Sequence, residues 1–146
     1  MRTHNLKYKC EIALLHADLS GFRAQEINCW RFVFDDITDD RNFKPVYLLN
    51  IDRFKLDLKT NKAISSGFAL SLFESPDAIK AKFIKLNSNK KNFPKLIGKN
   101  AAFAKLPYCG LNDDPSISGH FDLHEFNGID FSKLFTIDKT ILGGNN

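Results

Sequence analysis

The chain has few cysteines and no long hydrophobic run. Its three cysteines, Cys10, Cys29 and Cys109, are widely spaced, so neither a disulfide framework nor a CxxC zinc motif is indicated. No apolar segment approaches the roughly 20 residues that a transmembrane helix needs. The first nine residues lack the basic start and apolar centre of a secretory signal. We therefore expect free thiols and a soluble, cytoplasmic protein with no membrane-spanning segment.

One long stretch contains no acidic residue. Between Ala78 and Asn112 there is no Asp or Glu, whereas the same stretch contains eight lysines. It predicts a strongly positive surface, which is either a solvated helix face or a site for an acidic protein partner or a phosphate-bearing ligand. The stretch also lacks Arg, the usual base-reading residue, which argues against sequence-specific nucleic-acid binding. The candidate partner- or phosphate-binding residues are Lys80, Lys82, Lys85, Lys90 and Lys91.

Common catalytic signatures are missing as well. The sequence contains no P-loop, GxGxxG element, nucleophile elbow or HExxH motif. What it does contain is aromatic residues, including 14 Phe among 146 residues, and each buried ring removes a large area from water. This length and composition predict one globular domain over residues 1–146, with a frayed tail at about 143–146. Whether the chain is an enzyme is left open by the sequence.

Apolar periodicity predicts an α+β fold with a mainly antiparallel sheet of about 5–7 strands. The predicted strands cover residues 6–14, 29–34, 46–49, 67–73, 101–106 and 120–126. Alternating apolar residues over 54–58 permit a hairpin with its turn at 60–62. Residues 107–119, which hold two Pro and two Gly, are predicted to form a long exposed loop.

The clearest local signal predicts a helix over about 76–87. Ser75 is a favourable N-cap residue, and Pro76 suits the first helical position. Ile79, Phe83 and Leu86 then form one apolar stripe, with the lysines pointing elsewhere. One or two short helices are expected in addition, at 93–97, ended by Gly98, and at 129–135.

Two charged residues lie in strands that are otherwise apolar. In CWRFVF, Arg31 shares a face with Cys29 and Val33, so its guanidinium should be partly buried and needs a carboxylate, a phosphate or several carbonyls. In HFDLHEF, Glu125 shares a face with Phe121 and Leu123. Either Arg31 and Glu125 form a structural ion pair, or they belong to a site for an anionic ligand.

The other face of HFDLHEF carries the pattern H-x-D-x-H. His120, Asp122 and His124 are good ligand types for zinc or iron, and side chains two residues apart on a strand can share a metal. A third ligand would come from elsewhere, such as His4, His16 or Asp18. The alternative is a polar, solvent-facing stripe. Cys109 lies in the predicted loop and would be accessible as a nucleophile beside a histidine.

The order of three of these features resembles that of the ADP-ribosyltransferase superfamily. Arg31 lies in CWRFVF, Ser71 lies in GFALSLF before the predicted helix, and Glu125 lies in HFDLHEF. The resemblance implies that Arg31 holds a phosphate or ribose of NAD and that Ser71 orders the nicotinamide pocket. It implies that Glu125 either stabilises an oxocarbenium-like transition state or positions the acceptor.

Three functional hypotheses follow. The leading one is a non-enzymatic binding or regulatory protein, of an adaptor, antitoxin or immunity type, that uses the lysine-rich surface. The second is an NAD-using transferase with Arg31, Ser71 and Glu125, for which NAD is the cofactor. The third is a metal-dependent hydrolase that uses His120, Asp122 and His124, although a metal cofactor is the less favoured expectation.

Overall fold

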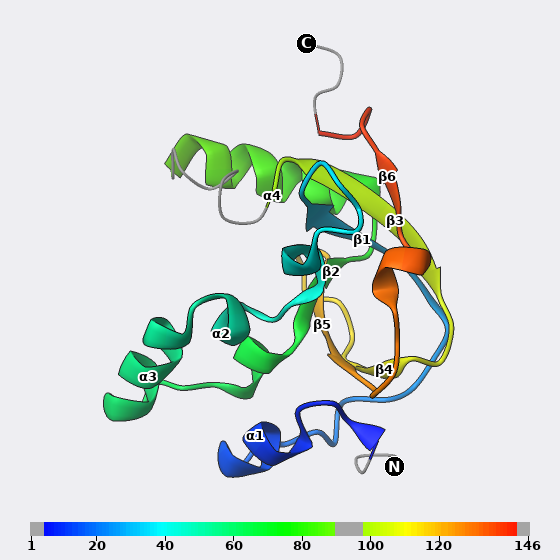
Figure 1. The fold of residues 1–146 in the computed structure, drawn as a ribbon. Coiled ribbons are helices and arrows are strands. Elements are labelled where there is room, and N and C mark those ends of the chain that lie inside the picture. Colours follow the sequence, from blue (N-terminus) through cyan, green and yellow to red (C-terminus); the bar gives the residue numbers. More distant parts are fainter. Residues whose placement is uncertain (1–4, 90–97, 143–146) are drawn as a thin grey trace.

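The computed structural model describes residues 5–89 and 98–142. Its framework is one antiparallel sheet of six strands in the order β4-β5-β2-β1-β3-β6, with helices packed around it (Figure 1). This confirms the predicted α+β class and the mainly antiparallel sheet. Among the described residues, no helix is both long enough and apolar enough to cross a membrane.

The helices and strands alternate irregularly along the chain. In chain order they are α1 (Lys9–Leu14), β1 (Ile27–Val33), η2 (Asp40–Phe43), α2 (Val46–Leu49), α3 (Ile51–Lys59), η3 (Ser65–Phe68), β2 (Leu70–Phe73), α4 (Pro76–Asn89), β3 (Asn100–Leu106), β4 (Gly110–Asn112), β5 (His120–Glu125), η4 (Phe131–Lys133) and β6 (Thr136–Asp138), where η marks a 3-10 helix.

The sheet has two covered faces, as the period-2 pattern of its strands predicts. On the first, here called the η4 face, strand residues such as Cys29, Val33 and Leu72 pack against Phe131 and Phe135. On the second, here called the α4 face, strand residues pack beneath α4. That contact consists of Trp30, Phe32, Phe73 and Ala101 of the sheet and Ile79, Phe83 and Leu86 of α4.

Helix α4 begins and faces the sheet as predicted. The backbone N–H of Ala78 donates to the Ser75 hydroxyl at 3.0 Å, which makes Ser75 the N-cap. Ile79 is fully buried, and Phe83 and Leu86 are partly buried beside it. The helix is longer than expected by two residues and ends at Asn89.

The prediction of a strand at 6–14 is wrong, because most of this segment forms helix α1. Tyr8, Ile12 and Leu15 point into a third apolar cluster, whereas Cys10 and Leu14 are exposed. Tyr8 and Ile12 belong to the alternating set and also, with Leu15, to the helical spacing i, i+4, i+7, and a short apolar run does not distinguish the two periods.

The strand predicted at 46–49 and the hairpin predicted around 54–58 are also wrong. They form helices α2 and α3. The side chain of Asn50 accepts a hydrogen bond from the backbone N–H of Arg53 at 3.0 Å and caps α3. Asn61, with a φ of 59°, follows the C-terminus of the helix. The sequence does contain a signal for this helix, namely the N-cap residue Asn50 followed by Asp52 in the first turn. The alternation of apolar residues obscured it.

The C-terminal half contains two strands that were not predicted. The loop expected at 107–119 contains strand β4. The short helix expected at 129–135 forms only as the 3-10 helix η4, and strand β6 follows it. Strands of three residues are too short to show a period, and their pairing with β5 and β3 is what defines them. The helix expected at 93–97 and the tail at 143–146 lie outside the described residues.

Candidate functional site

The guanidinium of Arg31 is held by backbone carbonyls. Its Nε donates to the carbonyl oxygen of Asn42 at 2.7 Å, and Nη1 donates to the carbonyl oxygen of Ser71 at 2.9 Å. The carbonyl of Ser71 can accept this hydrogen bond because the ladder between β1 and β2 has a single residue pair within the described residues, Trp30 with Phe73. Arg31 therefore joins two strands where their own ladder has ended. Burial lowers the pKa of the guanidinium to about 10, while the charge of Glu125 opposes the change.

Glu125 does not form an ion pair with Arg31. Its Oε1 lies 3.4 Å from Nζ of Lys7, and its Oε2 is buried without a hydrogen-bond partner. Burial raises the pKa of the carboxyl group, and the positive charges of Lys7 and Arg31 reduce that increase. The simple pairing of Arg31 with Glu125 that the sequence suggested is thus not observed, although the two charges influence each other.

The structure does not bring Arg31, Ser71 and Glu125 together as one set of side chains. Arg31 and Glu125 belong to the η4 face, because they alternate with residues that face α4. The Ser71 side chain lies on the α4 face, where Ser71 is the cross-strand partner of Asp122. Only the backbone carbonyl of Ser71 reaches Arg31.

Ser71 instead meets two residues of the H-x-D-x-H pattern. Its hydroxyl lies 2.6 Å from Nε2 of His120, and the same Nε2 lies 3.6 Å from Oδ1 of Asp122. The cross-strand pairing of β2 with β5 produces this polar cluster, because Ser71 is opposite Asp122 and Phe73 is opposite His120. Ser71 is exposed, whereas His120 and Asp122 are partly buried.

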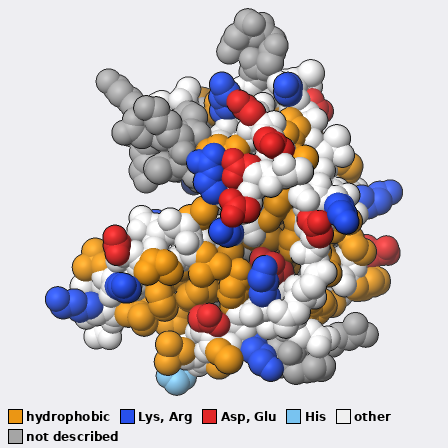
Figure 2. Space-filling model, viewed as in Figure 1, with side chains coloured by type: hydrophobic (Ala, Val, Ile, Leu, Met, Phe, Trp, Pro, Cys, Tyr) orange, Lys and Arg blue, Asp and Glu red, His pale blue; other side chains and the backbone are white. Residues whose placement is uncertain are grey.

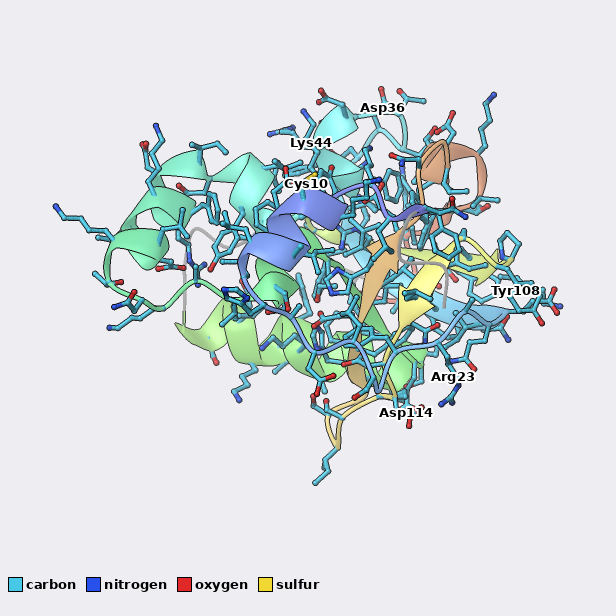
Figure 3. All side chains as sticks on the ribbon, turned by 90° about the horizontal axis from the view of Figure 1, so that it is seen from below. Cys10, Arg23, Asp36, Lys44, Tyr108 and Asp114 are labelled. Carbon is cyan, nitrogen blue, oxygen red and sulfur yellow. The ribbon has the colours of Figure 1, made fainter. Side chains whose placement is uncertain are left out.

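The covering elements leave Ser71 exposed at the edge of this cluster. On one side α4 covers β1 and β2, and on the other side the ring of Phe22 packs against His124, with 5.1 Å between the ring centroids. The segment of Phe22 is held in place because Arg23 pairs with β4 at Asn112 and its Nη2 lies 2.9 Å from Oδ1 of Asp114 (Figure 3).

Burial perturbs the acid–base properties of the cluster. It raises the pKa of Asp122 to about 6, and the negative charge of Asp113 adds to the increase. Burial lowers the pKa of His120, an effect that Asp113 opposes and Lys82 reinforces. Asp113, which the sequence did not single out, also accepts a hydrogen bond from the backbone N–H of Asp122 at 2.8 Å.

The cluster is not arranged as a nucleophilic triad. In a triad the hydroxyl and the carboxylate contact opposite nitrogens of the imidazole ring, so that the carboxylate fixes the tautomer that accepts the serine proton. Here both groups approach Nε2 of His120. The carboxylate of Asp122 therefore does not contact the ring nitrogen opposite Ser71 from which it could orient His120 as a base for that hydroxyl.

The third residue of the pattern, His124, points into the interior. Both of its ring nitrogens are buried without a hydrogen-bond partner, and burial lowers its pKa to about 4. Among residues 5–89 and 98–142, no group of three His, Cys, Asp or Glu side chains is placed to hold a metal ion. His16 and Asp18 are exposed near α1, and His4 lies outside the described residues.

Three of the five candidate lysines of the predicted basic surface lie on α4. Lys80, Lys82 and Lys85 are exposed, and none of them has a carboxylate of a described residue within ion-pair distance. Lys90 and Lys91 lie outside the described residues.

The three thiols are free, as predicted, but only Cys10 is exposed. Cys109 was expected to be accessible and is instead buried immediately before β4. Burial raises the pKa of its thiol to about 11, which removes it as a nucleophile at neutral pH.

Comparison of the chain with models of protein families, with curated proteins and with solved structures found no match.

Proposed function

We propose that this chain is a non-enzymatic binding domain that recognises an acidic protein partner through the lysine-rich surface of α4. The observation that carries the proposal is the set of three exposed lysines, Lys80, Lys82 and Lys85, that have no described carboxylate to neutralise them. Their positive charge is therefore available to a partner.

The way in which α4 is held supports this proposal. The apolar stripe of the helix packs on the sheet, and Ser75 caps its first turn. The lysines therefore project from a rigid element, which reduces the entropy that binding would cost. Lysines without arginines suit carboxylate-rich surfaces approached as point charges better than they suit base reading.

The predicted catalytic sets offer less support for an enzyme. The side chain of Ser71 lies on the opposite face of the sheet from the side chains of Arg31 and Glu125. The contact of Ser71 with His120 and Asp122 uses one ring nitrogen for both partners.

The test combines cross-linking of the full chain in cells with identification of the captured protein. The variant Lys80→Glu/Lys82→Glu/Lys85→Glu should abolish capture of an acidic protein. The matched control, Lys62→Glu/Lys133→Glu/Lys139→Glu, makes the same change in net charge at other exposed lysines and should retain it. The proposal is wrong if the α4 variant still captures the same partner, or if the ligand recovered is a nucleic acid or a small phosphate compound.

A further inference from the structure

Helix α3 leaves its apolar side chains uncovered. None of its nine residues is buried, although its sequence is amphipathic. Phe54 is partly buried against Tyr47 and Phe68, whereas Ile51 and Leu58 are 44% and 40% exposed. Ile51 and Leu58 are seven residues apart and so lie on the same side of the helix.

Exposed apolar side chains gather around this helix rather than being scattered over the molecule. Seven of the ten large apolar residues that are exposed in the described structure belong to α1, α2, α3 or the segment that follows α3. Figure 2 shows a broad hydrophobic area where Figure 1 places these helices. We call this area the helical apolar face and define it by Ile51 and Leu58 of α3 together with Val46 and Leu49 of α2. An apolar area of this kind on one side of a protein marks an interaction surface.

The border of the helical apolar face carries a net positive charge on α3, where Asp52, Lys55 and Lys59 are all exposed. Lys55 is one helical turn after Ile51 and three residues before Leu58, so it lies beside both, and Lys59 is one turn further. Neither lysine has a described carboxylate within ion-pair distance. Asp57 is already engaged, because its Oδ2 accepts a hydrogen bond from the Tyr47 hydroxyl at 2.8 Å and lies 3.8 Å from Nε of Arg53.

This charge pattern distinguishes between two occupants. In a symmetric dimer the same patch meets itself, so Lys55 and Lys59 of one copy would approach those of the other. A partner with acidic residues beside its apolar ones would pair with the same lysines. The pattern therefore favours a different protein over a second copy of this chain.

We propose that the helical apolar face binds an acidic amphipathic segment of a partner protein, one whose apolar stripe covers Ile51 and Leu58 while its carboxylates pair with Lys55 and Lys59. This mode of recognition places an amphipathic helix on an apolar surface. The inference rests on the proposed function in assigning an acidic protein partner, but its contact residues are separate from those of α4.

The experiment is a selection with the full chain from a phage-displayed library of random peptides of about 16 residues, enough for several helical turns. The enriched peptides should be acidic and carry apolar residues at helical spacing. Their affinities are then measured by fluorescence anisotropy. The variant Ile51→Ser/Leu58→Ser should weaken binding about tenfold or more, because it removes two apolar contacts at exposed positions. Lys55→Glu/Lys59→Glu should weaken it about fivefold or more.

The controls separate this inference from the proposed function. Lys80→Glu/Lys82→Glu/Lys85→Glu should leave peptide affinity within about twofold, because α4 is not part of the helical apolar face. Peptides that respond to the α4 variant and not to the α3 variants would overturn the inference and leave the proposed function supported. Enrichment of neutral or basic peptides, or no enrichment, overturns the inference. A dimer in sedimentation experiments that Ile51→Ser/Leu58→Ser disrupts would also overturn it, because the occupant would then be a second copy.

Discussion

His124 and Asp122 lie two residues apart on β5, and burial displaces their pKa values in opposite directions. The pKa of His124 falls to about 4, so the folded state keeps the ring neutral while the unfolded chain takes up a proton below about pH 6.5. This group therefore removes stability as the pH falls from about 6.5 to about 4. The pKa of Asp122 rises to about 6, so that group removes stability as the pH rises from about 4 to about 6. The two effects offset each other in the intact protein.

Replacing His124 should separate the two effects. His124→Phe removes two buried nitrogens that have no partner and keeps an aromatic ring beside Phe22. We expect the variant to be more stable by about 1–2 kcal/mol near pH 7, because the desolvation cost of those nitrogens disappears. The gain should increase by about a further 2 kcal/mol near pH 4.5, where the unfolded histidine of the parent chain is protonated. Urea denaturation at the two pH values measures both terms.

Asp122→Asn provides a control with the opposite pH dependence. It should stabilise the protein near pH 7, where the buried carboxylate is charged, and should have little effect near pH 4.5. The same substitution class at an exposed position, Glu74→Gln, should change little at either pH. A His124→Phe protein that is less stable than the parent at both pH values would contradict the assignment of His124 as an unsatisfied core residue.

At the level of elements, Gly98 lies just before β3 and packs against the end of β1 at Val33. Its φ is +85°, and a Cβ placed there would collide with the backbone carbonyl of Val33. This close approach allows Asn100 to pair with Val33, which begins the longest ladder of the sheet. The sequence indicated Gly98 only as a helix C-cap. Its contact with β1 depends on the pairing of two strands that are far apart in the chain.

Gly98→Ala should therefore be strongly destabilising. Gly128 is the matched control, because its φ is +82° but its Cβ position has nothing within 4 Å. Gly128→Ala should cost about 1 kcal/mol, the usual strain of a left-handed alanine, whereas Gly98→Ala should cost about 3 kcal/mol or more. Thermal and urea unfolding of both variants measure the difference. Equal costs at the two positions would mean that Val33 yields easily to the added methyl group.

Strands and helices differed in how well they could be predicted. CWRFVF contains aromatic and β-branched residues on both faces and has no helical alternative, and it forms β1. Residues 76–87 combine a cap, a proline and one apolar stripe, and they form most of α4. Residues 6–14 and 46–58 contain only short apolar runs with both periods present, and there the strands predicted turned out to be helices.

For the molecule as a whole, the described structure combines a closely packed sheet with a helical extension of few buried contacts. β3 is hydrogen-bonded on both sides, to β1 and to β6, and Ala101 and Ala102 within it are fully buried. α3 has no buried residue and contacts the body through Phe54 and through the hydrogen bond between Asp57 and the Tyr47 hydroxyl. Stability should therefore be distributed unevenly between the two parts.

Native-state hydrogen exchange should detect this difference. Amides of α3 should open with free energies that are at least about 2 kcal/mol below those of β3, because little apolar area is lost when α3 detaches. Peptides selected on the helical apolar face should raise the protection of α3 and leave that of β3 unchanged. Equal protection of α3 and β3 in dilute protein without any ligand would mean that the helical apolar face is already covered. That result would contradict the proposal that a partner protein binds there.

The exposure of Lys80, Lys82 and Lys85 and the alternation of strand faces were readable from the sequence, because both are local properties. Acid-free composition predicts a basic surface wherever the stretch folds, and a period of two places Arg31 with Cys29 and Val33 in any strand. The partners of those side chains depended on the tertiary structure. Which strands pair, and in which register, is set by burial summed over the whole chain. That pairing brings the Ser71 hydroxyl to His120 and Asp122. It also makes two backbone carbonyls, and not the Glu125 carboxylate, the hydrogen-bond acceptors of Arg31. The tertiary structure likewise leaves apolar side chains of α3 exposed.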